Sequence, residues 1–359
     1  MKRTIKRLLC AALSVLLVLS CACSTEKAQP LIEYKADGKT QGGLDTGFMY
    51  FWISFQKNMY SSVAQSYEDG WEHIVDPEQG TNLYDLLLTE SLESAKKLLA
   101  IEYMHDKEYN LILSDEEKEQ IDLQIESYIS AYGSKSALNS ELSKYGANIN
   151  TLRRYFELML KQNALLDYLY GENGADLPKE NQLKEFFANN YVIADHIFFS
   201  TAGGTKEDGT VVSLSEEEIE KKRELARDVY NRVTVLEENF DTLKAQYSED
   251  VFASEYYPHG FFVTNNSVFP TEFTRAVMSL SEGEITIAET PQKGIHVVKK
   301  LPMDENLYNA YEDVYTQLVS AVNSERFTNQ IIEKAQNAFV DETLMANYNV
   351  EIIPAFTLG

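Results

Sequence analysis

The chain has 359 residues, of which 32 are Lys or Arg and 56 are Asp or Glu, so its formal net charge is −24. Hydrophobic residues make up 44% and aromatic residues 11%, a composition typical of folded globular proteins. The acidic excess argues against nucleic acid or anionic lipid as a partner, because both bind clustered Lys and Arg. Three cysteines exclude a disulfide-based scaffold, and the length allows two or three domains.

The N-terminus is typical of a secretory signal peptide. Four basic residues precede an apolar run from Leu8 to Ser20, which is shorter than the roughly 20 residues of a membrane helix. The run ends in Val18-Leu19-Ser20-Cys21, which resembles a bacterial lipobox, in which the cysteine receives a diacylglyceryl group. We expect Cys21 to be the lipidation site, with Cys23 as second choice. An ordinary secretory signal is the alternative.

Two segments follow the predicted signal of residues 1–20. Residues 21–47 are polar and rich in glycine, which predicts a tether with room for one short strand near 31–34. From Phe48 onward, apolar residues recur every three or four positions, the pattern of amphipathic helices. Ser114 and Glu117 form a capping box, and Gly146 is placed to end a helix. The predicted helices span residues 48–64, 83–107, 136–145, 150–170 and 179–189, with another after the capping box.

The pattern then changes from helical to mixed. Residues 191–200 are rich in β-branched and aromatic residues, as strands are. A second capping box at Ser215 and Glu218 starts a helix that extends to 238. Later strands are predicted at 260–263, 285–289 and 295–300, with helices at 240–247 and 271–280. The chain is expected to be helical again over 306–348, with a final strand near 350–353.

This order predicts an α+β protein. Residues 48–189 and 304–359 would form one mostly helical module. A domain of residues 190–303, a small antiparallel sheet flanked by helices, would be inserted into it.

Five segments of the insert, taken in their order and spacing, resemble the conserved segments of one known family. They are Ala194-Asp195-His196-Ile197, Asn239 to Asp250, Gly260-Phe261-Phe262, Phe273 to Glu284, and Gly294-Ile295-His296-Val297-Val298. Together they resemble a parvulin-type peptidyl-prolyl cis-trans isomerase domain. The flanking helical regions, of which the N-terminal one is similar to the SurA chaperone domain, and the lipobox resemble the layout of PrsA-like foldase lipoproteins.

The resemblance implies which residues form the site. His196 and His296 match the paired histidines of the family, and Asp250 matches the position that holds Asp or Cys. Phe269 and Phe273 match the side chains that contact the proline ring. The implied enzyme is a peptidyl-prolyl isomerase that needs no metal and no other cofactor. From the residues alone, the histidines could instead complete a structural hydrogen-bond network, Asp250 could cap a helix, and both phenylalanines could be core.

The sequence departs from the family pattern at several positions. Tyr256-Tyr257 replaces a pair of glycines, and His259 replaces a leucine. The hydroxyl residue that the family often carries shortly before Gly294 would fall near Gln292-Lys293, where no hydroxyl stands. These departures motivate an alternative, a chaperone whose parvulin-like domain is inactive.

We therefore expect a lipid-anchored foldase on the outer face of the cytoplasmic membrane, which isomerises X–Pro bonds and assists folding. Its partners would be unfolded secreted polypeptides, and the membrane through Cys21; no nucleic acid is expected, and a homodimer is left open. A transporter's substrate-binding lipoprotein is disfavoured, because that class has two α/β lobes. Aromatic residues that could line a client groove, or form the core instead, are Phe48, Tyr50, Phe51, Trp52, Phe55 and Tyr60.

Overall fold

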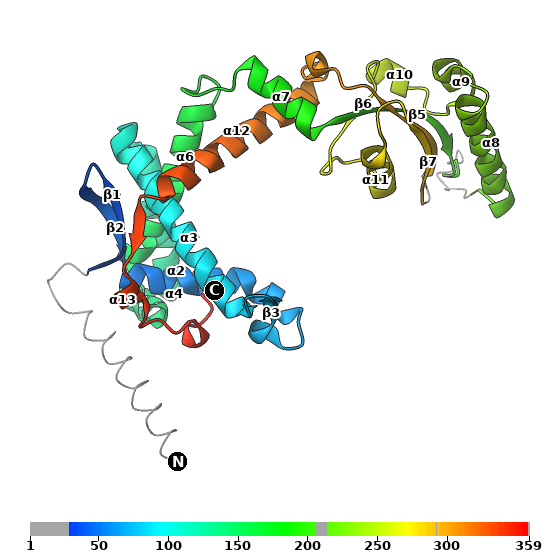
Figure 1. The fold of residues 1–359 in the computed structure, drawn as a ribbon. Helices are drawn as coiled ribbons and strands as arrows, with labels where there is room; N and C mark the ends of the chain where they lie inside the picture. Colours follow the sequence, from blue (N-terminus) through cyan, green and yellow to red (C-terminus); the bar gives the residue numbers. More distant parts are fainter. Residues whose placement is uncertain (1–28, 205–213, 292, 358–359) are drawn as a thin grey trace. The chain divides into compact units, whose positions relative to one another are not determined.

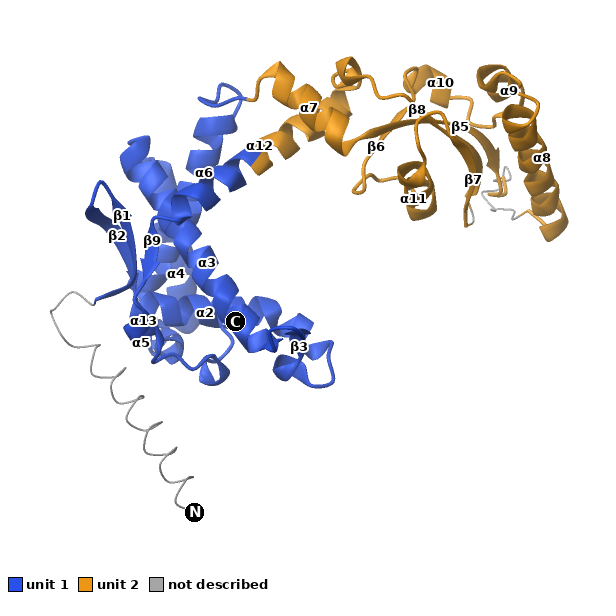
Figure 2. Cartoon of the chain, viewed as in Figure 1, with its two compact units in different colours: residues 1–177, 326–359 blue, residues 178–325 orange. Residues whose placement is uncertain are grey.

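The computed structural model describes residues 29–204, 214–291 and 293–357 (Figure 1). The chain divides into two units, residues 1–177 with 326–359 (unit 1) and residues 178–325 (unit 2), coloured separately in Figure 2. Within the described ranges, no helix combines the length and the apolar character that a bilayer span requires. The predicted signal peptide and Cys21 lie outside these ranges, so the predicted lipidation site stays a prediction.

Unit 1 is mostly helical, and its helices begin where the sequence predicts them. The Ser114 capping box is present, and Gly146 ends a turn with a φ of 69°. After Tyr103 the backbone widens into a π-helical turn, so the predicted helix 83–107 is α-helical only in its first part. The helices are α2 (Thr46–Gln65), α3 (Leu83–Tyr103), α4 (Asp115–Tyr132), α5 (Lys135–Leu142), α6 (Ile149–Tyr170) and α13 (Glu342–Met345), and a short hairpin pairs β3 (Ile74–Asp76) with β4 (Thr81–Asn82).

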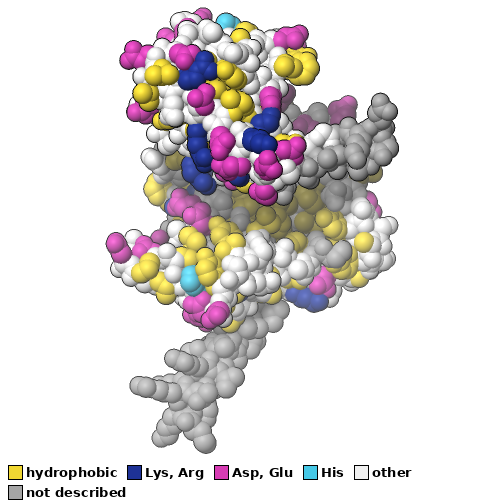
Figure 3. All heavy atoms as spheres, turned by 90° about the vertical axis from the view of Figure 1, so that its right-hand side faces the viewer, with side chains coloured by type: hydrophobic (Ala, Val, Ile, Leu, Met, Phe, Trp, Pro, Cys, Tyr) yellow, Lys and Arg dark blue, Asp and Glu magenta, His cyan; other side chains and the backbone are white. Residues whose placement is uncertain are grey.

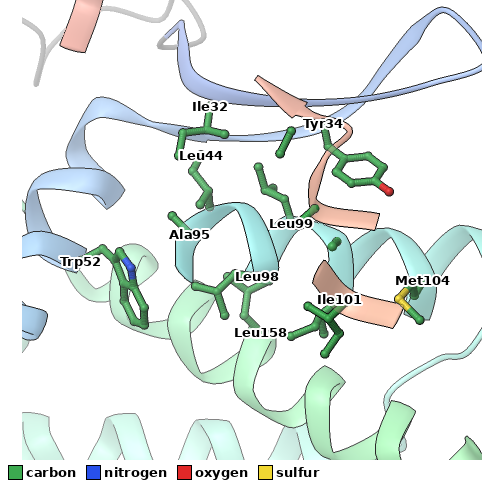
Figure 4. Packing of buried hydrophobic residues seen from close by; sticks show 14 of the residues in the cluster. Ile32, Tyr34, Leu44, Trp52, Ala95, Leu98, Leu99, Ile101, Met104 and Leu158 are labelled. Atoms are coloured by element: carbon green, nitrogen blue, oxygen red, sulfur yellow. The ribbon is translucent and has the colours of Figure 1, made fainter. Parts of the chain in front are cut away.

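A three-stranded antiparallel sheet packs against the helices of unit 1. β1 (Pro30–Ala36) lies between β2 (Lys39–Asp45) and β9 (Ala338–Val340). Figure 4 shows how side chains of this sheet, among them Ile32, Tyr34 and Leu44, meet α3 in the largest buried cluster of the described residues. Burial of this apolar face is what stabilises the hairpin.

The predicted tether is therefore wrong for residues 30–45, although the short strand near 31–34 is present within β1. Asp37 and Gly38 both have positive φ, 51° and 70°. They form a two-residue hairpin turn, in which Asp-Gly is a favoured sequence. Gly43 is required by packing, because a Cβ there would lie 2.7 Å from Pro30 Cβ. The glycines that suggested flexibility serve a tight turn and a close strand contact.

A buried lysine holds the C-terminal segment of unit 1. Lys57 Nζ in α2 donates hydrogen bonds to the carbonyl oxygens of Val350 (3.0 Å), Glu351 (3.1 Å) and Ile353 (2.8 Å). Its ammonium group also lies 5.0 Å from the Tyr84 ring centre, a cation–π contact. The predicted strand at 350–353 is wrong: this segment is a 3-10 turn whose carbonyls face Lys57 instead of a neighbouring strand.

We expect Lys57→Met to lower the free energy of unfolding of unit 1 by about 2–4 kcal/mol, because two buried carbonyl groups and one partly buried carbonyl group would lose a charged donor. Urea unfolding followed by tryptophan fluorescence reports this unit, since both tryptophans, Trp52 and Trp71, belong to it. The exposed Lys39→Met is the matched control. Equal unfolding midpoints for the two variants would contradict the assigned role.

Unit 2 contains a four-stranded antiparallel sheet in the order β6-β5-β8-β7. Side chains of α11 pack on one face, and those of α8 and α9 pack on the other. The predicted strands all form, and the Ser215 capping box starts α8. The strands are β5 (Val192–Ser200), β6 (Phe261–Val263), β7 (Ile285–Thr290) and β8 (Gly294–Leu301); the helices are α7 (Glu180–Asn190), α8 (Glu216–Thr234), α9 (Phe240–Tyr247), α10 (Ala253–Tyr256) and α11 (Thr271–Ser279).

Unit 2 is larger than the predicted insert of residues 190–303. Phe187 of α7 and Leu318 of α12 (Glu312–Ala335) share a buried cluster with Phe262 of the sheet. The Tyr311 hydroxyl donates to Gly260 O (2.9 Å) and accepts from the His259 N–H (2.9 Å). The predicted helix over 306–348 is α-helical mainly over 312–335 and then gives way to β9.

Candidate active site

The register of β5 and β8 brings the two predicted histidines together. His196 lies opposite Val298, and His296 lies opposite Phe198, so the histidines are diagonal neighbours. Even-numbered residues of both strands face α11, because side chains alternate along a strand. The two Nδ1 atoms are 3.1 Å apart, and the residues are only 6% and 7% exposed.

Two further side chains extend this pair into a chain of four. Asp250 lies just before α10, with Oδ2 3.2 Å from His196 Nε2. Its Oδ1 accepts the Ala253 N–H (3.1 Å), so Asp250 also caps a helix turn, as its sequence position allowed. At the other end, Thr290 Oγ1 lies 3.1 Å from His296 Nε2 and 3.0 Å from Gly294 O.

The charge states in this chain follow from its surroundings. The hydrogen bond from His196 lowers the pKa of Asp250 below its usual range, so Asp250 is a carboxylate near neutral pH. Burial lowers the pKa of His296 to about 3, and the neighbouring His196 acts in the same direction. His296 is therefore a neutral imidazole with one ring proton.

The two ends of this chain constrain where its protons lie. The Asp250 carboxylate only accepts hydrogen bonds, so His196 donates to it from Nε2. The Thr290 hydroxyl has a single proton, which it donates either to Gly294 O or to His296 Nε2. The one ring proton of His296 lies on Nε2 in the first case and on Nδ1, toward His196, in the second.

Thr290 is the residue that the sequence analysis missed. We looked for the hydroxyl near Gln292-Lys293, and Gln292 lies outside the described residues. The structure places the hydroxyl at the end of β7, where Thr290 pairs with Gly294 across the turn. Pairing the predicted strands 285–289 and 295–300 as a hairpin could have revealed this residue, because the pairing puts Thr290 on the same face of the sheet as His296.

Aromatic rings cover the histidine pair on the side of α11. Phe273 is 2% exposed, with ring centres 5.2 Å from His296 and 5.9 Å from His196. Phe269 is half-buried and lies 5.5 Å from Phe273, so it is the more accessible of the two predicted rings. Phe261, which was not singled out, lies 4.8 Å from His196.

Phe198 completes this surface from β5. Its half-buried ring lies 4.7 Å from the His296 ring, two residues after His196 and therefore on the same face. A Cβ on Gly294 would overlap this ring and lie 2.6 Å from Phe199 O. The glycine that precedes Ile295-His296 is thus required by the ring of Phe198.

The substituted positions lie beside the site without occupying it. Tyr256 is 63% exposed, and Tyr257 packs against Phe261 at 4.9 Å and against Tyr311 at 5.5 Å. His259 contacts Tyr311 through its backbone N–H. These residues tie the loop before β6 to the residues that precede α12.

Residues 177–302 match the protein family described as the PPIC-type PPIase domain. The chain therefore carries a parvulin-type domain, as the five segments of the sequence predict, and unit 2 contains nearly all of the matched residues.

The chain is also similar to solved structures of PrsA foldases. These are PrsA from Bacillus subtilis (20% identity, 79% of this chain and 95% of that chain covered, TM-score 0.22), the peptidylprolyl isomerase PrsA from Bacillus anthracis (19%, 67% and 94%, 0.25) and foldase protein PrsA from Streptococcus pneumoniae (16%, 77% and 87%, 0.24). Among curated proteins, none matches the chain.

The lowered pKa of His296 predicts a pH-dependent stability for unit 2. The pKa is about 3 in the folded chain and about 6.5 when unfolded. Between about pH 3 and 6.5 the unfolded state binds one more proton than the folded state. The free energy of unfolding therefore falls as the pH falls, by up to about 1.4 kcal/mol per pH unit. His296→Gln should remove this dependence, so its stability should fall less steeply between about pH 6 and 4.

Urea unfolding followed by circular dichroism measures both curves, and tryptophan fluorescence from unit 1 serves as the internal control. Parallel pH profiles for the wild-type chain and His296→Gln would contradict the neutral, buried His296.

Proposed function

We propose that this protein is a lipid-anchored, extracytoplasmic foldase that isomerises X–Pro bonds of secreted polypeptides. The observation that carries the proposal is the hydrogen-bonded chain Thr290–His296–His196–Asp250 next to aromatic rings, within a domain of the PPIC-type family. His196, His296 and Asp250 are the proposed catalytic residues, and Phe269 and Phe273 the proposed contacts for proline.

The reaction makes limited demands on a protein. Rotation about an X–Pro bond has to overcome a barrier of about 18–20 kcal/mol, which arises from amide resonance. At the twisted transition state this resonance is lost, and the amide carries less charge separation than in its planar form. A catalyst must bind the twisted form more tightly than the planar one, and no covalent bond needs to form.

The side chains of the site suit this task. The half-buried ring of Phe269, beside Phe273, offers an apolar contact for the proline, and such surroundings solvate the polar, planar amide poorly. Asp250 presents an ionised carboxylate that is 31% exposed at the edge of these rings. His196 fixes the position of this carboxylate through its Nε2, and His296 and Thr290 hold His196 in turn.

Location and partners are proposed from the sequence. The lipobox-like Val18-Leu19-Ser20-Cys21 supports an anchor at Cys21 on the outer face of the cytoplasmic membrane. Chains that cross this membrane unfolded would then be the substrates. The mostly helical unit 1 would bind them. Phe51 and Trp52, two of the aromatic residues that could have lined a client groove or formed the core, are buried in the core of unit 1.

A holdase with an inactive parvulin-like domain is the second candidate. It is favoured by the burial of His196, His296 and Phe273, each less than 10% exposed, which leaves only the edge of the site open. It would suppress aggregation of unfolded proteins without turning over proline bonds.

Prolyl exchange in a short Ala-Pro peptide, measured by NMR with residues 24–359, tests the proposal. We expect exchange well above the uncatalysed rate, which corresponds to tens to hundreds of seconds. Asp250→Ala should lower the catalysed rate about 10- to 100-fold, because it removes the charge that orients the site. Thr290→Val should lower it less, about 3- to 10-fold, since it removes one hydroxyl at the far end of the chain.

Asp228→Ala, an exposed carboxylate in α8 of the same unit, is the matched control and should keep the wild-type rate. Wild-type rates in folded Asp250→Ala would overturn the assigned site. No acceleration by the folded wild-type chain, with aggregation of a client still suppressed, would establish the holdase.

A further inference from the structure

We propose that Arg275 marks a second binding site in unit 2, which takes an acidic side chain of the client near its proline. This inference rests on the proposed function and names a substrate preference for it. The observations that carry it are a hollow next to Phe269, the pairing of the other arginines, and the polar side chains around Arg275.

The hollow has a volume of about 500 Å³ and lies along α11 and the loop before it. Its lining includes Asn265, Ser267, Phe269, Thr274, Arg275 and Met278. Phe269 belongs both to this lining and to the ring surface of the site, 5.5 Å from Phe273 and 5.6 Å from Phe261. A peptide whose proline contacts Phe269 can therefore reach the hollow with a neighbouring residue.

Arg275 differs from the other arginines of the described chain. Each of the other six forms an ion pair with a carboxylate of the protein, as Arg223 does with Glu289 and Arg227 with Glu220; the remaining four are Arg153, Arg154, Arg232 and Arg326. Among the arginines of the described residues, Arg275 alone has no carboxylate oxygen within 4.0 Å, although Glu272 stands one turn earlier in α11. Figure 3, which shows one face of the molecule, illustrates the general pattern, with Lys and Arg side chains beside those of Asp and Glu.

The chemistry of the hollow favours a carboxylate. An exposed guanidinium group presents a planar pair of N–H donors that matches a carboxylate in geometry as well as charge. Ser267, Thr274 and Asn265 line the same hollow, and the buried Thr274 hydroxyl has no hydrogen-bond partner among the described residues. The net charge of −24 repels acidic clients in general, so a cation that pairs with none of the described carboxylates favours those clients that bring an acidic residue to it.

The geometry of an extended peptide sets the position of the acidic residue in the client. Phe269 and Arg275 line the same hollow, and successive residues of an extended peptide advance about 3.3 Å and point to opposite sides. The residue two positions from the proline points to the same side as the proline, so we expect the acidic residue there.

Two matched pairs of peptides test the inference. One pair carries Glu or Gln at the second position after an Ala-Pro unit, and the other carries them at the second position before it. Binding to residues 24–359 is measured by NMR chemical-shift titration at low salt, and turnover by prolyl exchange in the same samples. The proteins are the wild-type chain, Arg275→Gln, and Arg227→Gln as a control arginine in the same unit.

In the wild-type chain and in Arg227→Gln, we expect the Glu peptide of one pair to bind about three- to tenfold more tightly than its Gln partner. The ratio should fall to about one in Arg275→Gln, and should decrease in about 0.5 M NaCl. Equal binding of Glu and Gln peptides by the wild-type chain, or an unchanged ratio in Arg275→Gln, would overturn the inference.

Binding and turnover separate the two proposals. A Glu preference that depends on Arg275 without prolyl turnover would support this site and overturn the isomerase activity. Prolyl turnover without any Glu preference would support the isomerase activity and overturn the binding site at Arg275.

Discussion

The antiparallel pairing of β5 with β8 is the constraint on which the site depends. It places two imidazole rings on one face of the sheet, buried, with their Nδ1 atoms 3.1 Å apart. Buried polar atoms need partners, so the rings require an acceptor at one end and a hydroxyl at the other, and Asp250 and Thr290 supply these. A one-residue shift in this pairing would send every side chain of the shifted strand to the opposite face and disperse the chain of four.

The remainder of unit 2 keeps this pairing in place. The helices α8 and α9 cover the face opposite the histidines, and Lys244 of α9 forms an ion pair with Asp195, the residue before His196 (2.6 Å). On the other face, α11 supplies Phe273 to the histidines and presents Arg275 to the adjacent hollow. One helix thus connects the ring surface proposed for proline with the site proposed for an acidic neighbour.

The sequence predicted the parts that depend on local pattern. Strand alternation, capping boxes and the five motif segments placed His196, His296 and Asp250 in elements that the structure brings together. Thr290 was missed because its place depends on the register between two strands, and the hairpin at 30–45 because its glycines resemble those of a flexible tether. The boundaries of unit 2 depend on which surface a helix buries, and periodicity alone cannot show that α7 packs on the sheet at Phe262.

The most direct measurement is a long-range ¹⁵N–¹H NMR spectrum of the histidine ring nitrogens, recorded for the wild-type chain and Asp250→Ala across the pH range. Because the pKa of His296 is lowered to about 3, it should remain neutral, with one ring proton, at every pH well above that value. Because the four groups form one chain, Asp250→Ala should also shift the His296 nitrogens, two hydrogen bonds away. A His296 that titrates near 6.5, the ordinary value, or does not respond to Asp250→Ala would contradict the coupled site.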